Sequence, residues 1–303
     1  MGASITGIGA NVYDTLIQLP AFPEEDTKCY ARRFVCSGGG PAATGLVAAS
    51  KLGAKTSALA VLSTDAGGEF LRRDYEKYGV DTRLIEVREG ESFSATVILN
   101  SQTGSRTCLL YRGTLPPLEL RETHRQEIAD AEILMVDGNE LSAAIAGAKV
   151  AREAGTRVLY DAGGRYPGVE ELLPWVDILI PSAEFALGFT GKTSLEEAAV
   201  RLYETYRPEI VVITNGSRGG LYYDGSLHTY AAFSVEVVDS NGAGDVFHGA
   251  FAFAVTRGYS WEEACRFSSA VSALKCTRLG ARAGVPSLEE VLRFLETGEI
   301  LQK

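Results

Sequence analysis

The sequence of 303 residues predicts an α/β fold with a central, mostly parallel sheet, helices on both of its faces and a small additional β-sheet. Three observations support this prediction. From residue 56 onward, short apolar runs alternate with helix-like segments, as in parallel strands joined by crossover helices. Two segments, at about 16–37 and 93–111, interrupt this alternation with strand-like patterns. A Gly-Ala-Gly-Asp turn at 242–245 precedes a helix-like segment of small and apolar residues.

The elements follow in order along the chain. A buried first strand is expected at 5–12, ending at Tyr13-Asp14, which would place Asp14 at the carboxyl end of a central strand, where ligands bind in open α/β sheets. Further strands are expected at 56–63, 133–136, 157–161, 177–180, 209–214 and 235–240. Helices are expected at 41–52, 67–78, 119–129, 142–154, 247–255 and 268–277.

The two interrupting segments predict a separate small sheet. Residues 27–35 alternate in polarity like a strand with one exposed face, and 93–111 reads as a hairpin turned at Thr103-Gly104. A hairpin at the edge of the main sheet is the structural alternative. We treat residues 1–303 as one α/β domain into which these strands are inserted.

Composition and charge exclude several classes of protein. The formal net charge of −10 and the lack of a basic run argue against nucleic-acid and membrane partners. The five cysteines form no CxxC pair, which argues against a zinc site or a disulfide framework. No apolar run approaches the roughly 18 residues of a membrane span, and the first residues lack a basic signal region. These features predict a cytoplasmic protein.

The turn at 242–245 is the strongest functional signal. Free backbone N–H groups of Gly242, Ala243 and Gly244 at the start of a helix would favour a bound anion, and the glycines allow close approach. Asp245, in the first helical turn, would lie beside that anion and could accept a proton from an attacking hydroxyl. The structural alternative is an ordinary helix start, where aspartate is common.

Two glycine-containing segments resemble nucleotide-binding motifs without matching them. In the segment GIGANV the third glycine of a dinucleotide fingerprint would fall at Val12. In the segment 186–193 the first glycine of a P-loop is Ala186, and the segment leaves a short helix rather than a strand. Both motifs are therefore set aside.

The segments SNGAGDVFHGAF and GGGPAATGLVAASKLG, taken together, resemble the two signatures of the ribokinase-like, or PfkB, carbohydrate kinases. The resemblance extends over nearly the whole chain and implies a ribokinase-like fold with a lid sheet, ATP and Mg²⁺ as cofactors, and a small sugar as substrate. It also implies a homodimer formed through the lid. The sequence departs from the family pattern at Ser240, where Thr is usual, and at Thr44, where Asn is usual.

The resemblance assigns roles to individual residues. Asp245 would be the catalytic base, with Gly242, Ala243 and Gly244 as the anion hole. The residues that would hold the sugar are Asp14, Gly39, Gly40, Thr44, Asn139 and Arg112. The residues that would bind the nucleotide are Thr214, Gly216, Gly219, Ser182 and Lys275. A monovalent cation such as K⁺ would bind near Asp239.

The magnesium signature of the family is missing here. Counting back from Thr190-Gly191 places Ser182 at its Asn position and Phe185 at its Glu position. Mg²⁺ would then be held chiefly by nucleotide phosphates and water. Similarly, the segment 161–165 resembles the family's Asp-x-Asn-x-Arg, with Gly163 in place of Asn.

Within the family the sequence most resembles the sulfofructose kinase and ketohexokinase branch. The sulfofructose kinases carry an arginine for the sulfonate near the position of Asn139, and an amide replaces a guanidinium poorly at an anion. Arg106 or Arg112 could compensate. We therefore favour an uncharged, fructose-like ketose, with sulfofructose, ribose or a nucleoside as alternatives; a sugar-binding sensor and a dehydrogenase using GIGANV are the competing classes.

Overall fold

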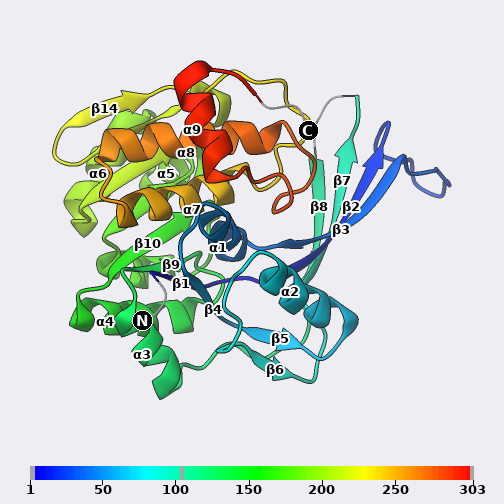
Figure 1. Ribbon diagram of the computed structural model, residues 1–303, viewed down its shortest axis with the longest axis horizontal. Helices are drawn as coiled ribbons and strands as arrows, with labels where there is room; N and C mark the ends of the chain where they lie inside the picture. Colours follow the sequence, from blue (N-terminus) through cyan, green and yellow to red (C-terminus); the bar gives the residue numbers. More distant parts are fainter. Residues whose placement is uncertain (1–3, 103–105, 301–303) are drawn as a thin grey trace.

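The computed structural model describes residues 4–102 and 106–300, and in that part of the chain the central sheet has eight strands (Figure 1). Their spatial order is β14 (Leu227–Tyr230), β13 (Gly220–Tyr223), β12 (Ile210–Thr214), β11 (Ile178–Pro181), β10 (Arg157–Ala162), β9 (Ile133–Val136), β1 (Ile5–Ile8) and β4 (Thr56–Leu59). The strands from β12 to β4 run parallel, whereas β13 and β14 add an antiparallel edge. This arrangement confirms the predicted mostly parallel sheet.

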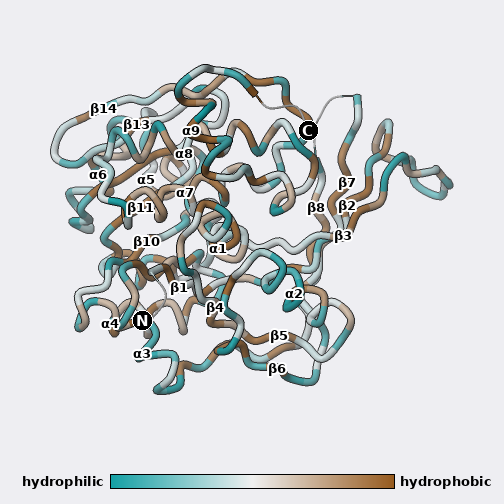
Figure 2. Tube along the Cα trace, viewed as in Figure 1, coloured by the Kyte–Doolittle hydropathy of each residue, from teal (hydrophilic) through white to brown (hydrophobic). Residues whose placement is uncertain are grey.

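Helices cover both faces of this sheet. One face packs against α1 (Pro41–Lys51), α7 (Ala243–Thr256), α8 (Trp261–Cys276) and α9 (Leu288–Thr297). The other packs against α3 (Glu122–Asp130), α4 (Leu141–Ala154), α5 (Ala183–Thr190) and α6 (Leu195–Tyr206). The strands between these layers are buried almost throughout, and Figure 2 shows them as a hydrophobic interior. Apolar runs without alternation are what such a two-sided burial requires.

A separate four-stranded sheet, called the lid sheet here, projects from one side of the molecule (Figure 1). Its order is β3 (Arg33–Gly39), β2 (Val12–Leu19), β7 (Ser94–Asn100) and β8 (Arg106–Tyr111). The central pair, β2 and β7, is parallel, while both outer pairs are antiparallel. The predicted turn at Thr103-Gly104 lies outside the described residues.

Four strand predictions need correction. The strand expected at 27–35 begins only at Arg33, in β3, and continues to Gly39. The expected strand at 5–12 is split: β1 ends at Ile8, and the chain passes through Gly9-Ala10-Asn11 into β2 of the lid sheet. Asp14 therefore lies in the lid sheet and not at the end of a central strand. The expected strand at 56–63 is likewise divided, into β4 and β5 (Val61–Ser63). Residues 235–240 form no strand, since Val237 and Val238 are exposed and the segment leaves the sheet.

Smaller elements complete the described chain. Strand β5 pairs with β6 (Glu86–Arg88) in a two-stranded sheet, next to α2 (Ala66–Lys77). Short 3₁₀ turns occur at Val169–Glu171, Leu173–Trp175 and Gly216–Arg218. None of the helices in the described residues has both the length and the apolar character needed to cross a membrane.

Candidate active site

Two cavities meet at the first turn of α7. The lid cavity, of about 190 Å³, lies between the lid sheet and the start of α1, and Asp245 forms part of its wall. The helix cavity, of about 520 Å³, lies between α7, α8 and the loop after β12, and Ala243 and Gly244 form part of its wall. One short turn thus presents a carboxyl group to one cavity and backbone to the other.

The lid cavity brings together every residue predicted to hold the sugar. They come from β2, the turn into α1, the loop after β9 and the end of β8, and they are Asp14, Gly39, Gly40, Thr44, Asn139 and Arg112. The helix cavity brings together three of the residues predicted to bind the nucleotide, Thr214, Gly216 and Gly219. Side chains and backbone from segments far apart in the sequence therefore surround two adjoining spaces.

The turn that separates the cavities depends on Gly242. Its φ of 75° is left-handed, and a Cβ there would lie 2.6 Å from Cβ of Ala281. The carbonyl of Gly242 accepts the Val246 N–H at 2.9 Å, which starts α7. The Ala243 N–H donates to Ser240 O at a long 3.2 Å, so an anion at this amide would replace a weak bond.

The entry to α1 is built around Gly40 and Asp137. Gly40 has a φ of 96°, and a Cβ there would lie 1.9 Å from the carbonyl oxygen of Ala10, so no other residue fits. The buried Asp137 carboxylate accepts hydrogen bonds from the N–H groups of Ala10, Ala42 and Asn139, at 3.0, 3.1 and 2.9 Å. One carboxylate thereby joins three segments that form the cavity wall.

The two carboxyl groups that line the lid cavity, those of Asp14 and Asp245, have raised pKa values. Burial raises the pKa of Asp14 to about 7, opposed by the charge of Arg282 and reinforced by that of Asp245. Burial also raises the pKa of Asp245, with His248 as the main opposing group. A carboxyl group with a raised pKa is a stronger base once ionised, which suits proton transfer near neutral pH.

Thr44 presents a hydroxyl group with nothing to bind in the described structure. The side chain is fully buried, lines the lid cavity, and its Oγ1 has no hydrogen-bond partner among the described residues. Buried hydroxyl groups are normally paired, and an unpaired one costs free energy. The Thr44 hydroxyl group is thus an unpaired polar group in the wall of the lid cavity.

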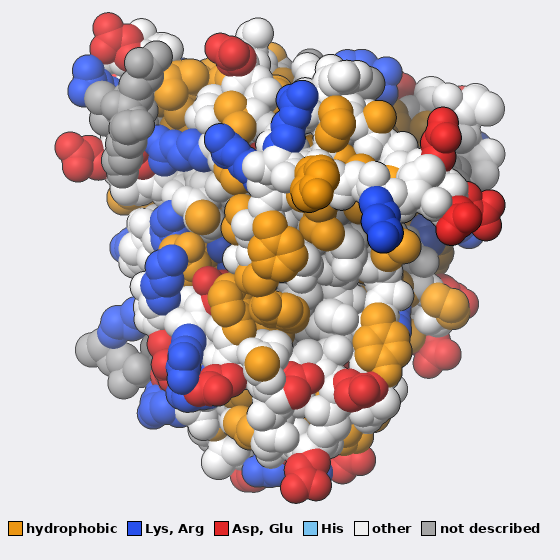
Figure 3. Space-filling view, turned by 90° about the vertical axis from the view of Figure 1, so that its right-hand side faces the viewer, with side chains coloured by type: hydrophobic (Ala, Val, Ile, Leu, Met, Phe, Trp, Pro, Cys, Tyr) orange, Lys and Arg blue, Asp and Glu red, His pale blue; other side chains and the backbone are white. Residues whose placement is uncertain are grey.

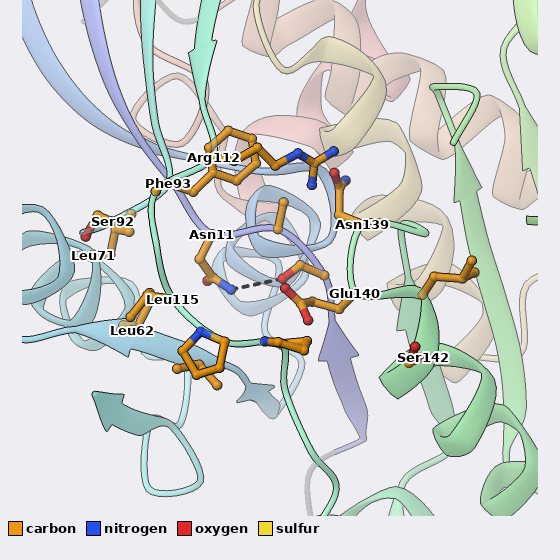
Figure 4. Close-up of a pocket in the computed structure, with 17 residues that line it drawn as sticks. Asn11, Leu62, Leu71, Ser92, Phe93, Arg112, Leu115, Asn139, Glu140 and Ser142 are labelled. Carbon is orange, nitrogen blue, oxygen red and sulfur yellow. Dashed lines mark hydrogen bonds between the residues drawn. The ribbon is translucent and has the colours of Figure 1, made fainter. Parts of the chain in front are cut away.

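A third cavity, called the outer cavity here, adjoins the lid cavity and has a volume of about 370 Å³. The two share Ala10, Phe93, Arg112 and Asn139. The Arg112 guanidinium lies 5.3 Å from the Phe93 ring centroid, and Figure 4 shows it directed toward Asn139. Arg112 and Asn139 therefore stand at the boundary between the two cavities.

Two residues predicted to bind the nucleotide are not among the described residues that line the helix cavity. The Ser182 hydroxyl accepts the N–H of Phe185 at 3.1 Å and caps α5. Lys275 is fully buried, donates to Asp239 O at 2.7 Å, and lies 3.8 Å from Oδ2 of Asp239. The Lys275 ammonium group thus supplies positive charge where the sequence led us to expect a monovalent cation.

The Asp239 carboxylate has further partners. It accepts the N–H groups of Asn241 and Gly280, both at 2.8 Å. No group of three or more His, Cys, Asp or Glu residues in the described chain is arranged to hold a metal ion.

The sequence pattern gave no reason to single out several residues of this region. Tyr166 and Asn241 line the lid cavity, and Arg282 is buried beneath it, paired with Asp74 at 2.8 Å and donating to Gly39 O at 2.8 Å. His248 lies in α7 next to Asp161. Of these residues, only Arg282 could have been noticed in the sequence, as a charged residue in the otherwise small and apolar segment GARAGVP.

Comparison with known proteins identifies the family. A model of the pfkB family carbohydrate kinases matches residues 8–288. The chain is 27% identical over 304 residues to ribokinase from Haemophilus influenzae, covering 98% of this chain and 99% of the relative. It is 27% identical over 286 residues to ketohexokinase from Mus musculus, covering 89% and 94%.

A solved structure agrees with these sequence relatives. The structure of Arabidopsis thaliana ribokinase complexed with ribose and ATP matches with a TM-score of 0.87 at 26% identity, covering 98% of this chain and 99% of that one. The predicted ribokinase-like fold is thereby confirmed. The chain belongs to the pfkB family of carbohydrate kinases, enzymes that transfer a phosphoryl group to a sugar hydroxyl group.

Proposed function

We propose that this kinase uses ATP to phosphorylate a hydroxymethyl group of a fructose-like ketose. The observation that carries the proposal is the position of the 242–245 turn between two cavities, with Asp245 on the lid cavity and Gly244 on the helix cavity. A sugar in the lid cavity and a nucleotide in the helix cavity would meet at this turn. The solved relative that holds both ribose and ATP supports this division of the site.

The chemistry follows from that placement. The sugar oxygen attacks the γ-phosphorus in line, a new P–O bond forms, and the bond to the β-phosphate oxygen breaks, with ADP leaving with the electron pair. The hydroxyl proton passes to the Asp245 carboxylate. The N–H groups of Gly242, Ala243 and Gly244 hold charge on the phosphoryl group, while Asp14, Gly39, Gly40 and Thr44 orient the sugar.

The cofactors of the proposed reaction are ATP and Mg²⁺, with K⁺ as a further candidate. Mg²⁺ bound to the nucleotide would neutralise phosphate charge in this reaction. The candidate site for K⁺ lies near Asp239, where the Lys275 ammonium group already faces the carboxylate. Turnover measured with K⁺ replaced by tetramethylammonium tests whether K⁺ is needed near Asp239 in addition to the Lys275 ammonium group.

The charges at the outer boundary of the lid cavity favour an uncharged substrate. The Arg112 guanidinium lies over Phe93, and its charge also lowers the pKa of Glu140, which burial raises. Asn139 is neutral. Among the described residues that line the lid cavity, Arg112 is the one cation, and it already interacts with a carboxyl group, which supports fructose-like ketoses ahead of sulfofructose.

We also propose that the protein is a homodimer whose contact is the lid sheet. Phe34 and Leu109 lie on the face of this sheet opposite Asp14 and are 66% and 52% exposed. Figure 3 shows hydrophobic side chains gathered on this side of the molecule. Such a patch on the surface of a protein is a common site of association.

The unpaired cysteines agree with a reducing compartment, the cytoplasm.

The direct test is ATP consumption with Mg²⁺ against fructose, tagatose, psicose, ribose, sulfofructose, fructose 6-phosphate and adenosine. We expect one of the uncharged ketoses to give the strongest turnover. A strong response to sulfofructose would overturn the preference for uncharged sugars, and one to ribose or adenosine would identify a pentose or nucleoside kinase. Sugar binding without any ATP turnover would indicate a sensor, and failure to bind ATP would contradict the proposal itself.

The role of Asp245 has its own test. In Asp245→Asn the side chain keeps its size but cannot accept the proton, so we expect turnover to fall about 10²- to 10⁴-fold. ATP affinity, measured by calorimetry, should stay close to that of the unmodified protein. Asp130→Asn, at an exposed position in α3, is the control. Turnover of Asp245→Asn equal to that of the control would exclude Asp245 as the base.

A further inference from the structure

His248 lies at the centre of the proposed site without facing either cavity. It is almost completely buried in the second turn of α7, 3% exposed, and its ring contacts the first turn of the same helix and the two strands β10 and β11. Nδ1 lies 2.6 Å from the carbonyl oxygen of Gly244, and Nε2 lies 2.9 Å from that of Ile180. Both partners are carbonyl oxygens, which can only accept hydrogen bonds.

This environment determines the protonation of the ring. A neutral imidazole carries one N–H and would leave its other nitrogen lone pair against a carbonyl oxygen. A ring with a proton on each nitrogen donates to Gly244 and to Ile180 at once. The positive charge then has a counterion, because Oδ2 of Asp161 lies 3.1 Å from Nδ1. Oδ2 has no hydrogen-bond partner among the described residues. Burial raises the pKa of Asp161 to about 7 and the charge of His248 opposes that rise, so a charged ring and an ionised Asp161 would stabilise each other.

The ring is connected to Asp245 in two ways. Its Nδ1 holds the carbonyl group of Gly244, the residue directly before Asp245, and so fixes the first turn of α7 against β10 and β11. Its charge also acts on the Asp245 carboxyl group. The charged and titratable side chains around that carboxyl group are Asp14 on β2, Arg106 on β8, Asp137 after β9, Asp161 on β10, His248 on α7 and Lys275 on α8.

We propose that His248, protonated on both ring nitrogens and paired with Asp161, is a positioning residue that orients Asp245 and keeps its carboxylate ionised. The role of Asp245 as the base rests on the proposed function, but the protonation of the His248 ring does not. Three carboxyl groups, Asp14, Asp137 and Asp161, would otherwise repel an Asp245 anion. The imidazolium ion is the nearest positive group in α7 itself.

The protonation is tested on the unmodified protein by NMR of ¹⁵N-labelled histidine. The chain has three histidines, so Asn substitutions at His124 and His228 assign the spectrum without disturbing the site. At about pH 8 we expect both ring nitrogens of His248 to carry hydrogen, whereas solvent-exposed imidazole is mostly neutral at that pH. A bare ring nitrogen at pH 8 would overturn the proposal, whether or not the enzyme phosphorylates any sugar in the panel.

The effect on Asp245 is tested by the pH dependence of kcat/KM in three variants. In His248→Asn we expect the acid limb to move up by about one pH unit, because the favourable charge is lost. In Asp161→Asn it should move down, because an unfavourable charge is lost, and the double variant should fall between the two. His124→Asn, which replaces another buried histidine that is hydrogen-bonded to Leu84 O and the Arg121 N–H, should leave the limb in place.

Opposite shifts separate electrostatics from loss of structure, since misfolding lowers kcat without moving the acid limb. Shifts of His248→Asn and Asp161→Asn in the same direction, or an acid limb of His248→Asn identical to that of His124→Asn, would contradict the proposal. If His248→Asn does not fold, Asp161→Asn and the NMR measurement still decide the question. If NMR finds the doubly protonated ring but no sugar is turned over, the proposed function fails alone.

Discussion

Ligand binding and stability make opposite demands on Asp14. Its pKa of about 7 in the folded protein exceeds the value near 4 of an unfolded aspartate. Between these values the folded state binds the extra proton, so the contribution of this group to stability falls as pH rises from about 4 to about 7 and stays low above that. Above about pH 7 an ionised Asp14 therefore lowers stability, a cost that the proposed role in sugar binding would explain.

Replacing Asp14 by Asn should separate these two demands. We expect the free energy of unfolding at pH 8 to rise by an amount on the order of 1 kcal/mol, with a smaller gain at pH 5. Sugar affinity should fall by about tenfold or more, because a charged hydrogen bond is lost. Urea unfolding at both pH values and KM for the sugar measure the two effects. A variant less stable at pH 8 than at pH 5, relative to the unmodified protein, would contradict the assignment.

The unpaired hydroxyl group of Thr44 leads to a similar prediction with a matched control. Thr44→Val keeps the shape and removes a group without a partner, so stability should stay equal or rise, while KM for the sugar should increase about tenfold. Thr156 is also buried, but its hydroxyl oxygen lies 2.9 and 3.0 Å from the carbonyl oxygens of Ile128 and Ala131. Thr156→Val should destabilise the protein by about 1 to 3 kcal/mol and leave KM unchanged. Thermal unfolding and steady-state kinetics of both variants test the contrast.

At the scale of elements, α1 and α7 cross with almost no space between their backbones. A Cβ on Gly249 would lie 2.0 Å from the carbonyl oxygen of Gly45, whereas a Cβ on Gly244 would meet no atom within 4 Å. The two glycines lie in the same helix and serve different purposes. Gly249 permits the crossing, and Gly244 leaves space for a ligand in the helix cavity.

Alanine at each glycine should therefore have opposite consequences. We expect Gly249→Ala to lower the free energy of unfolding by about 2 kcal/mol or more, since the backbone of α1 must move. Gly244→Ala should change stability by less than about 1 kcal/mol and reduce kcat, because the methyl group would enter the space proposed for phosphate. Denaturant unfolding and ATP turnover distinguish the outcomes. Equal destabilisation by the two changes would mean that the crossing is not limited by Gly249.

Some elements could be predicted from sequence because local pattern determined them. The apolar runs of β9 to β12 and the glycine-bounded helices fall where periodicity indicates. The end of β1 could not be found in this way, because residues 5–12 are apolar enough to read as one strand, and only the contacts of Gly9 to Asn11 redirect the chain into the lid sheet. The strand predicted at 235–240 was wrong for a related reason. A run of valines has strand propensity, but no neighbouring strand in the described chain pairs with it.

The site shows the same division. Its glycines and Asp245 occur in compact motifs, which are visible in one sequence. His248 pairs with Asp161, 87 residues away, and Arg282 pairs with Asp74, 208 residues away. No local sequence pattern indicates such contacts. Ser182 and Lys275 do not line the helix cavity in the described chain. Their side chains are engaged by the Phe185 N–H group and by Asp239 instead.

At the scale of the whole molecule, the lid sheet determines the proposed assembly. If a second copy covers it, Phe34→Glu and Leu109→Glu should convert a dimer into a monomer, because burying a carboxylate in an apolar contact is costly. Leu292 in α9 is 47% exposed and far along the chain, so Leu292→Glu is a matched control and should remain dimeric. Light scattering coupled to gel filtration gives the masses. A monomeric unmodified protein would rule the lid contact out.

The early position of the lid strands in the sequence has a consequence for the order in which the parts of the fold are made. Every strand of the lid sheet belongs to the first 111 residues, whereas β1 is completed on one side only by β9, which follows at residue 133. A chain emerging from the ribosome therefore carries the finished lid strands, with their exposed apolar residues, before the central sheet can close around β1. Residues 242–245 emerge much later still, so the lid strands are made long before the turn to which we assign the reaction.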